Sequence, residues 1–92
     1  MPTTRDYKDI YALFAAARTE KEVQMLFDDI FTPQEIDSLV ERWNIVQELQ
    51  SGTAQRTIAQ KLGVSISKIT RGSRVLQHGS GGFAYFLKKL KK

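Results

Sequence analysis

Apolar residues recur along the chain at spacings of three and four, which is the period of an α-helix. No segment shows the sustained alternation of apolar and polar residues that is typical of a β-strand. The pattern therefore predicts an all-α fold with six helices. Their expected ranges are residues 6–18, a second helix from a cap at 19 to about 30, then 33–50, 53–62, 66–77 and 83–92.

Two threonines carry the start signals of helices. Thr32 precedes Pro33, which suits the first helical position, and Glu35 follows at the distance of a capping box. Thr19 is followed by Glu22 at the same distance and predicts a second capping box. These signals set the beginnings of the second and third helices.

The long third helix has a broad apolar face in a chain that has little else to bury. That face consists of Ile36, Leu39, Val40, Trp43, Val46 and Leu49. A chain of 92 residues buries only about 60–65% of its unfolded surface. It contains no cysteine, and its one histidine, His78, cannot by itself form a metal site, so disulfides and the usual metal sites are excluded. We expect the long helix, which should end at a left-handed Gly52, to pack against a second subunit.

Residues 54–76 have the spacing of a helix-turn-helix. Gly63 supplies the left-handed conformation of a tight turn. Small and apolar residues expected to face inward flank that glycine, namely Ile58, Ala59, Leu62, Val64 and Ile69. An ordinary helical hairpin with a polar outer face is the structural alternative.

The polar residues of this segment are candidates for contacting DNA. In a helix-turn-helix, the N-terminal half of the second helix meets the base edges in the major groove. Ser65 is expected to cap that helix, and the small hydroxyl groups would allow close approach. Basic side chains there can bind phosphates or guanine. The candidates from the pattern are Arg56, Ser67, Lys68, Thr70 and Arg71.

The charge distribution favours a polyanionic partner. Residues 1–52 hold all ten acidic residues and five Lys/Arg, whereas residues 53–92 hold nine Lys/Arg and no acid. Double-stranded DNA is the partner that best fits this asymmetry together with the helix-turn-helix pattern. Two alternatives stay open. The final lysines could form a solvated basic tail, or the basic amphipathic helix 83–92 could bind RNA, a membrane or an acidic protein.

Other function classes have little support in the sequence. The chain has no cysteine nucleophile and no Gly-rich phosphate loop after a strand, so an enzyme is not expected. His78 is expected to lie at a helix C-terminus, favourably placed against the helix dipole. No apolar run is long enough to span a membrane, and the first residues lack the apolar core of a signal peptide. We therefore expect a cytoplasmic protein that does not bind membranes.

Several short motifs resemble those of the tryptophan repressor family. The resemblance covers roughly residues 26–76, and more loosely the whole six-helix order. Its most specific elements are Phe31-Thr32-Pro33, Arg42, Leu49-Gln50-Ser51-Gly52 and Ile69-Thr70-Arg71-Gly72-Ser73. Gly72 is notable because a glycine in mid-helix costs about 1 kcal/mol relative to alanine. Either a bound ligand or tight helix packing would account for it.

The resemblance implies a fold, a partner and an effector. It implies that residues 1–92 form a single Trp-repressor-like DNA-binding domain and an intertwined homodimer. It implies a bacterial transcriptional repressor that binds a double-stranded operator and responds to a small corepressor such as L-tryptophan. Ile66 joins the expected DNA contacts. The residues implied at the effector site are Thr32, from the other subunit, with Arg42, Val46, Arg71 and Gly72.

Some residues depart from the family pattern. Val75 stands where the family has a serine that holds the amino group of the ligand, and Asp29 replaces an apolar pocket residue. Lys68 replaces a small hydroxyl residue, and one residue is missing near Thr53. The alternative function is therefore a DNA-binding protein of the same fold with a different effector or none. The sequence does not distinguish a repressor from an activator, nor does it identify the operator.

Overall fold

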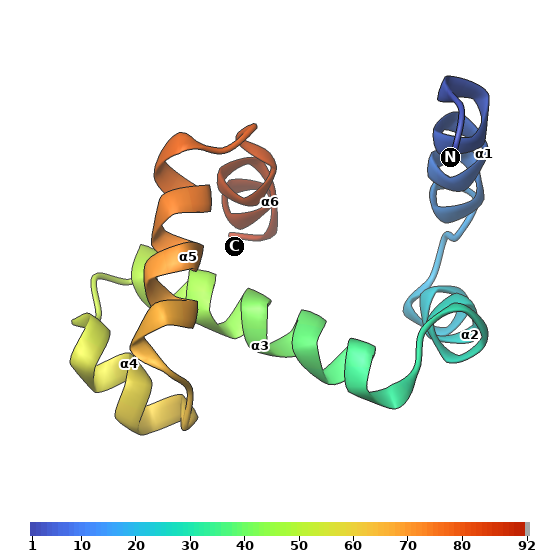
Figure 1. The fold of residues 1–92 in the computed structure, drawn as a ribbon. Coiled ribbons are helices and arrows are strands. Elements are labelled where there is room, and N and C mark those ends of the chain that lie inside the picture. Colours follow the sequence, from blue (N-terminus) through green and yellow to red (C-terminus); the bar gives the residue numbers. More distant parts are fainter. Residues whose placement is uncertain (92) are drawn as a thin grey trace. The chain divides into compact units, whose positions relative to one another are not determined.

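The computed structural model describes residues 1–91, and within them it contains six α-helices and no strand (Figure 1). The helices are α1 (Thr4–Ala15), α2 (Glu20–Ile30), α3 (Pro33–Gln50), α4 (Gln55–Leu62), α5 (Ile66–His78) and α6 (Gly82–Leu90). The predicted all-α class and the order of the six helices are confirmed. No helix in the described part of the chain is long and apolar enough to cross a membrane.

The first helix begins earlier than predicted because a capping box precedes it. The Thr3 N–H donates to Asp6 Oδ2 at 2.8 Å, and the Asp6 N–H donates to Thr3 Oγ1 at 3.2 Å. These bonds satisfy two N–H groups that have no partner inside the helix. The expected start at Asp6 was therefore wrong, as was the expected end at Arg18, because α1 ends at Ala15.

The capping box of α3 is confirmed, whereas that of α2 is only half formed. Thr32 N–H donates to Glu35 Oε1 at 2.9 Å, and Glu35 N–H donates to Thr32 Oγ1 at 3.1 Å. Thr19 Oγ1 accepts from Glu22 N–H at 3.1 Å as expected. The Glu22 carboxylate, however, accepts from Arg18 N–H at 2.8 Å instead of returning to the cap residue.

The ends of the later helices differ slightly from the prediction. α4 begins at Gln55 rather than Thr53, because the cap residue Ala54 has an extended backbone with φ −62° and ψ 143°. α5 extends to His78, which confirms the expected position of the histidine in the last turn. α6 starts at Gly82 and ends at Leu90, before the predicted end of the helix; Lys92 lies outside the described residues.

The chain divides into two compact units, and the division falls within α3, after Asp37. In the first unit the rings of Phe14, Phe27 and Phe31 contact one another, with centroids 5.1–6.4 Å apart. No residue of α1 or α2 is buried. Their large exposed apolar side chains are Tyr7, Ile10, Tyr11, Leu13, Val23, Met25 and Ile30. The apolar stripes of these two helices are therefore open in the single chain, and the single-domain assignment stays a prediction.

The core of the second unit joins the predicted inward residues of the helix-turn-helix to α3, a contact that the sequence did not predict. Ile45 of α3, Ile58 of α4 and Ile69 of α5 are buried and contact one another. The ribbon shows α4 and α5 lying against the C-terminal part of α3 (Figure 1). The partly buried residues around this core are Leu49, Ala59, Leu62 and Val64. The inward-facing positions that the helical spacing predicted within residues 54–76 are thus confirmed.

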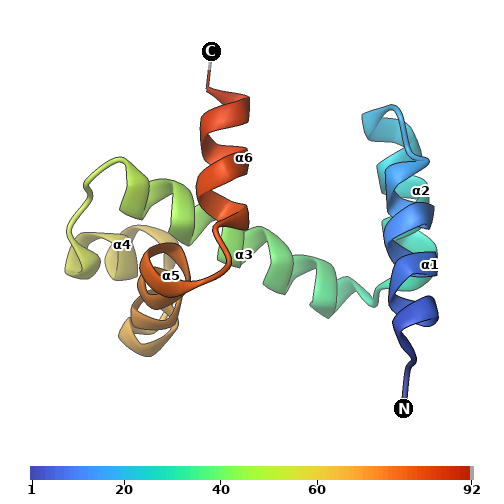
Figure 2. The ribbon, with the colours of Figure 1, turned by 90° about the horizontal axis from the view of Figure 1, so that it is seen from above.

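The last helix joins this unit through an aromatic contact. α6 crosses α3 steeply (Figure 2), and the Phe83 ring lies 6.1 Å from the half-buried Trp43 ring between centroids. Tilted aromatic pairs at this distance are attractive beyond the area they bury. The contact places the N-terminal end of α6 beside the middle of α3.

Gly72 marks the closest approach of α5 to α3. A Cβ atom at this position would lie 3.0 Å from Ile45 Cγ2 and 3.8 Å from Leu49 Cδ1. Ile45 is itself buried against the isoleucines of α4 and α5, so it has little room to move. Close helix packing therefore explains the mid-helix glycine without a ligand.

Gly72→Ala is expected to lower the free energy of unfolding by about 1 kcal/mol. Overpacking of a close-packed core costs roughly 1–3 kcal/mol, which outweighs the helix-propensity gain of about 1 kcal/mol. Urea denaturation at fixed protein concentration measures the difference. Gly82→Ala is the matched control, because the nearest atom to its Cβ would be 3.9 Å away. If Gly72→Ala were more stable than the wild type, the Ile45 side chain would be able to move away from the added Cβ atom.

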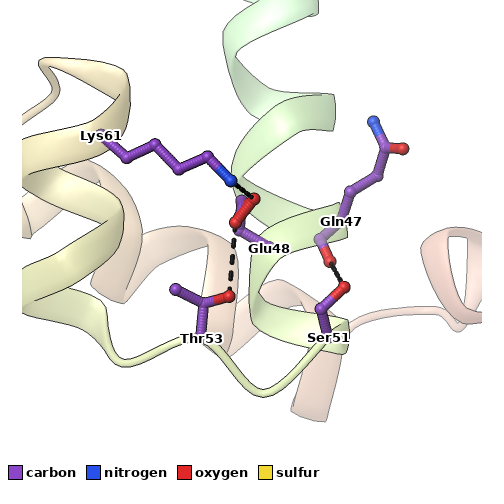
Figure 3. A network of polar contacts seen from close by, with 5 residues as sticks. All are labelled: Gln47, Glu48, Ser51, Thr53 and Lys61. Atoms are coloured by element: carbon purple, nitrogen blue, oxygen red, sulfur yellow. Dashed lines mark hydrogen bonds and ion pairs between the residues drawn. The ribbon is translucent and has the colours of Figure 1, made fainter.

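Glu48 fixes the C-terminal end of α3 to α4 (Figure 3). Lys61 Nζ lies 2.6 Å from Glu48 Oε1, and the Thr53 hydroxyl donates to Glu48 Oε2 at 3.3 Å. The hydrogen bond from Lys61 lowers the pKa of Glu48 below its ordinary value; partial burial acts against this, and the Lys61 charge and Thr53 add to it. The Ser51 hydroxyl donates to the Gln47 carbonyl at 3.0 Å and closes the last turn of α3.

The lowered pKa of Glu48 predicts a pH-dependent contribution to stability. A carboxylate with a lower pKa in the folded state stabilises the fold above its unfolded pKa and loses that effect as pH falls through the folded pKa. The stability advantage of the wild type over Glu48→Gln should thus be full at neutral pH and shrink below about pH 4.5. Thermal unfolding from pH 7 to pH 3 tests this. In a Lys61→Gln background the pH dependence of the difference should largely vanish.

Candidate nucleic-acid interface and ligand pocket

The turn between α4 and α5 has the backbone that the sequence predicts. Gly63 adopts φ 66° and ψ 35°, the left-handed conformation that favours glycine. Ser65 then caps α5, and its hydroxyl accepts from the Lys68 N–H at 3.3 Å. The turn and the cap hold the first turn of α5 at the surface, while Ile69 anchors the helix in the core.

One face of α5 is exposed along most of its length. Its residues line a shallow hollow, and we call them the outer strip of α5: Ile66, Ser67, Thr70, Arg71 and Arg74. All are exposed to solvent. The first four were predicted to contact DNA, and the structure brings them together on one side of the helix. Arg74 was not predicted, although its place four residues after Thr70 and three after Arg71 is a signal that could have found it.

The two remaining DNA candidates lie outside the outer strip. Arg56 is exposed in the first turn of α4. Lys68 is exposed on α5, but its Nζ lies 2.7 Å from Glu41 Oε1 of α3. Lys68 is therefore engaged in an ion pair that the sequence pattern did not indicate, since the two residues are 27 positions apart.

A pocket of about 310 Å³ lies between α3, α5 and the start of α6. This volume is at the lower end of the range of small-molecule sites, which is about 300–1,000 Å³. We call it the α3–α5 pocket. Its lining residues are Ser38, Glu41, Arg42, Ile45, Val46, Lys68, Arg71, Gly72, Val75 and Phe83.

The pocket contains four of the five residues expected at an effector site. Arg42, Val46, Arg71 and Gly72 all line it. Val46 is buried and Gly72 half-buried, whereas both arginines are exposed. Thr32 belongs to the first unit, where its hydroxyl accepts the capping bond from Glu35. The structure thus groups the predicted residues of the second unit and leaves the role of Thr32 as a prediction.

Val75 also lines the pocket, at the position where the family resemblance implied a ligand-holding side chain. The other lining residues had not been expected at this site; they are Ser38, Glu41, Ile45, Lys68 and Phe83. Helical spacing from Arg42 would have indicated Ser38, four residues before it, and Ile45, three residues after it, as near neighbours. Phe83 carried no such signal, because it reaches the site from another helix after a glycine-rich break.

Arg71 is the residue shared by both surfaces. It lines the α3–α5 pocket and also belongs to the outer strip of α5. A guanidinium group can stack on a planar ring and can also bind guanine or phosphate. One side chain could thus respond to a ligand on one side and to DNA on the other.

Among the described residues, no group of three or more His, Cys, Asp or Glu side chains gathers in a way that could hold a metal ion. The groups at the outer strip and the pocket are guanidinium, ammonium, carboxylate, hydroxyl and apolar groups. Such a set is suited to binding.

Comparison with known proteins places the chain in a family. The family model described as Trp repressor protein matches residues 5–91 of the 92-residue chain. Neither the curated proteins nor the solved structures gave a match. The family match includes all six helices except the first residue of α1, together with the outer strip of α5 and the α3–α5 pocket. The chain therefore belongs to the Trp repressor family, a regulatory and non-enzymatic family of DNA-binding proteins that control transcription.

Proposed function

We propose that this protein is a sequence-specific repressor whose affinity for its operator is controlled by a small aromatic effector in the α3–α5 pocket. The observation that carries the proposal is the position of Arg71, which lines both the pocket and the outer strip of α5. A ligand that contacts Arg71 would change the orientation of a DNA-contacting side chain. Such a ligand would bind the state that binds the operator and the state that does not with different affinities, which is the requirement for allosteric control.

In this proposal α5 enters the major groove of the operator. Arg71 and Arg74 pair with guanine or phosphate, and Ser67 and Thr70 bond to bases or to the backbone. The exposed Ile66 contacts a thymine methyl group. Arg56, on α4, contacts the phosphate backbone and fixes the position of the helix.

The protein would bind DNA as a homodimer. Support comes from the apolar stripes of α1 and α2, which include no buried residue in the single chain. A second copy would cover them, and two α5 helices would then meet half-sites about one helical turn of DNA apart. Sedimentation equilibrium should give twice the chain mass of 10.5 kDa at micromolar concentration. A monomer at these concentrations would contradict the dimer.

The operator and the effector can be tested in one experiment. DNA duplexes selected from a random pool by the protein should share a sequence with two-fold symmetry. L-tryptophan and indole compounds with the same ring are then added, and at least one should change the affinity for the selected duplex by about 5- to 150-fold. Thr70→Ala should retain salt-dependent binding and lose sequence preference. Failure to enrich any sequence would contradict the proposed function.

A regulator of the same fold with another effector, or none, is the second candidate. It is favoured by the apolar groups of Val75 and Phe83 in the pocket lining, which offer no hydrogen bond to a ligand amino group. Thermal denaturation with each compound separates the candidates. A ligand at 100 times its dissociation constant adds about 2.7 kcal/mol of stability, whereas a compound that does not bind adds none.

A further inference from the structure

The ion pair between Glu41 and Lys68 is part of the α3–α5 pocket. Both residues line it, and their charged atoms are 2.7 Å apart. The side chain of Lys68 is 60% exposed and that of Glu41 is 34% exposed, so neither is fixed by burial. An exposed ion pair contributes little to stability and is exchanged readily for another partner.

The charges around the pocket are unequal. Its lining includes three cations, Arg42, Lys68 and Arg71, and one carboxylate, Glu41. The carboxylate is already engaged by Lys68. The lining as a whole is therefore positive, and a bound carboxylate would be attracted while an ammonium group would be repelled.

The rest of the lining sets the shape and polarity of the ligand. Ile45, Val46, Val75 and Phe83 give an apolar surface, and Gly72 exposes backbone without a side chain. The two guanidinium groups, from α3 and α5, favour a planar ring. The hydroxyl group of Ser38 is the uncharged polar side chain in the lining. Within the lining that one chain supplies, a ligand ammonium would therefore meet one side-chain hydroxyl and one carboxylate, which Lys68 already holds.

We propose that the α3–α5 pocket selects an aromatic monocarboxylate that lacks an ammonium group, and that Glu41 and Lys68 determine this selectivity. The ligand carboxylate shares the Lys68 ammonium with Glu41, which stays paired. This inference rests on the proposed function, because it identifies the class of effector for the same pocket. Lys68 is thereby assigned to ligand binding rather than to DNA alone.

Three probes that share one ring isolate the effect of charge. Indole-3-propionate carries only a carboxylate, tryptamine only an ammonium group, and L-tryptophan both. Titration calorimetry of the full chain without DNA should show the propionate binding at least tenfold more tightly than L-tryptophan. Tryptamine should bind most weakly. The proposal is overturned if either ammonium compound binds as tightly as the propionate, or if none of the three binds.

Two substitutions, each removing one charge of the Glu41–Lys68 pair, should have opposite effects on propionate binding. Glu41→Gln removes the competitor for Lys68 and should tighten propionate binding severalfold. Lys68→Gln removes the carboxylate partner and releases Glu41, so propionate binding should weaken about tenfold while tryptamine binding strengthens. A structural role for the ion pair would weaken all probes alike and would overturn the proposal. Circular dichroism confirms that both variants fold.

Lys61→Gln is the matched control. Lys61 is also 60% exposed and pairs with a glutamate of α3 at 2.6 Å, but neither partner lines the α3–α5 pocket. Its loss should leave the order of the three probes unchanged. The selection of DNA duplexes from a random pool tests the proposed function independently of the three probes. Charge selectivity without sequence-specific DNA binding would overturn the proposed function alone, and specific DNA binding with tryptamine preferred would overturn this inference alone.

Discussion

Replacing Arg71 with alanine is expected to weaken binding to the selected DNA by roughly tenfold to a hundredfold and to weaken effector binding as well. Loss of a good bidentate contact to a base costs about 1–3 kcal/mol, which corresponds to this range. The second effect follows from the position of Arg71 in the lining of the α3–α5 pocket. Fluorescence anisotropy with labelled duplex and calorimetry with indole-3-propionate measure the two losses independently.

Two other arginines provide the controls for Arg71. Arg74 belongs to the outer strip but does not line the α3–α5 pocket, so Arg74→Ala should weaken DNA binding and leave effector binding unchanged. Arg42 lines the pocket but not the outer strip, so Arg42→Ala should have the opposite effect. If Arg71→Ala behaves like either control, the two surfaces are not coupled through this residue.

The sequence predicted the parts of the fold that depend on local spacing. The turn at Gly63 and the inward positions of Ile58 and Ile69 followed from the helical period and from the conformational preference of glycine. The cap at Thr32 followed from a capping box that the structure forms in full. These features are decided within one or two helical turns.

Contacts between distant residues could not be predicted in this way. The Glu41–Lys68 ion pair joins residues 27 positions apart, and Phe83 reaches Trp43 from another helix. Helical periodicity identifies the face on which a side chain lies, but it does not identify the partner helix. For this reason the arginines of the pocket were assigned to it through family motifs, whereas the Glu41–Lys68 pair in its lining appeared only with the tertiary structure.

Two isoleucines of α5 lie in opposite environments. Ile66 and Ile69 lie one turn apart on α5, yet Ile69 is 0% exposed and Ile66 is 50% exposed. Ile69 contacts the buried isoleucines of α3 and α4. The same side chain therefore belongs to the core at one position and to the exposed outer strip of α5 at the other.

Ile69→Ala is accordingly expected to lower the free energy of unfolding by about 2–5 kcal/mol, the usual cost of such a truncation in a core. This is a large share of the roughly 5–15 kcal/mol that stabilises a typical domain. Urea denaturation at fixed protein concentration measures the loss. A change below about 1 kcal/mol would show that the three-isoleucine core does not hold α5 against α3 and α4.

Ile66→Ala is the matched substitution. In contrast to Ile69→Ala, it should change stability little and weaken DNA binding. Removing an exposed side chain should change stability by no more than about 0.5 kcal/mol. Binding to the selected duplex should nevertheless weaken severalfold, because the contact with a thymine methyl is lost. For Ile69→Ala, DNA affinity measured well below the unfolding midpoint should fall only in proportion to the unfolded fraction. If Ile66→Ala leaves DNA binding unchanged, the N-terminal turn of α5 does not enter the groove, and the interface has to be sought further along the helix toward Arg74.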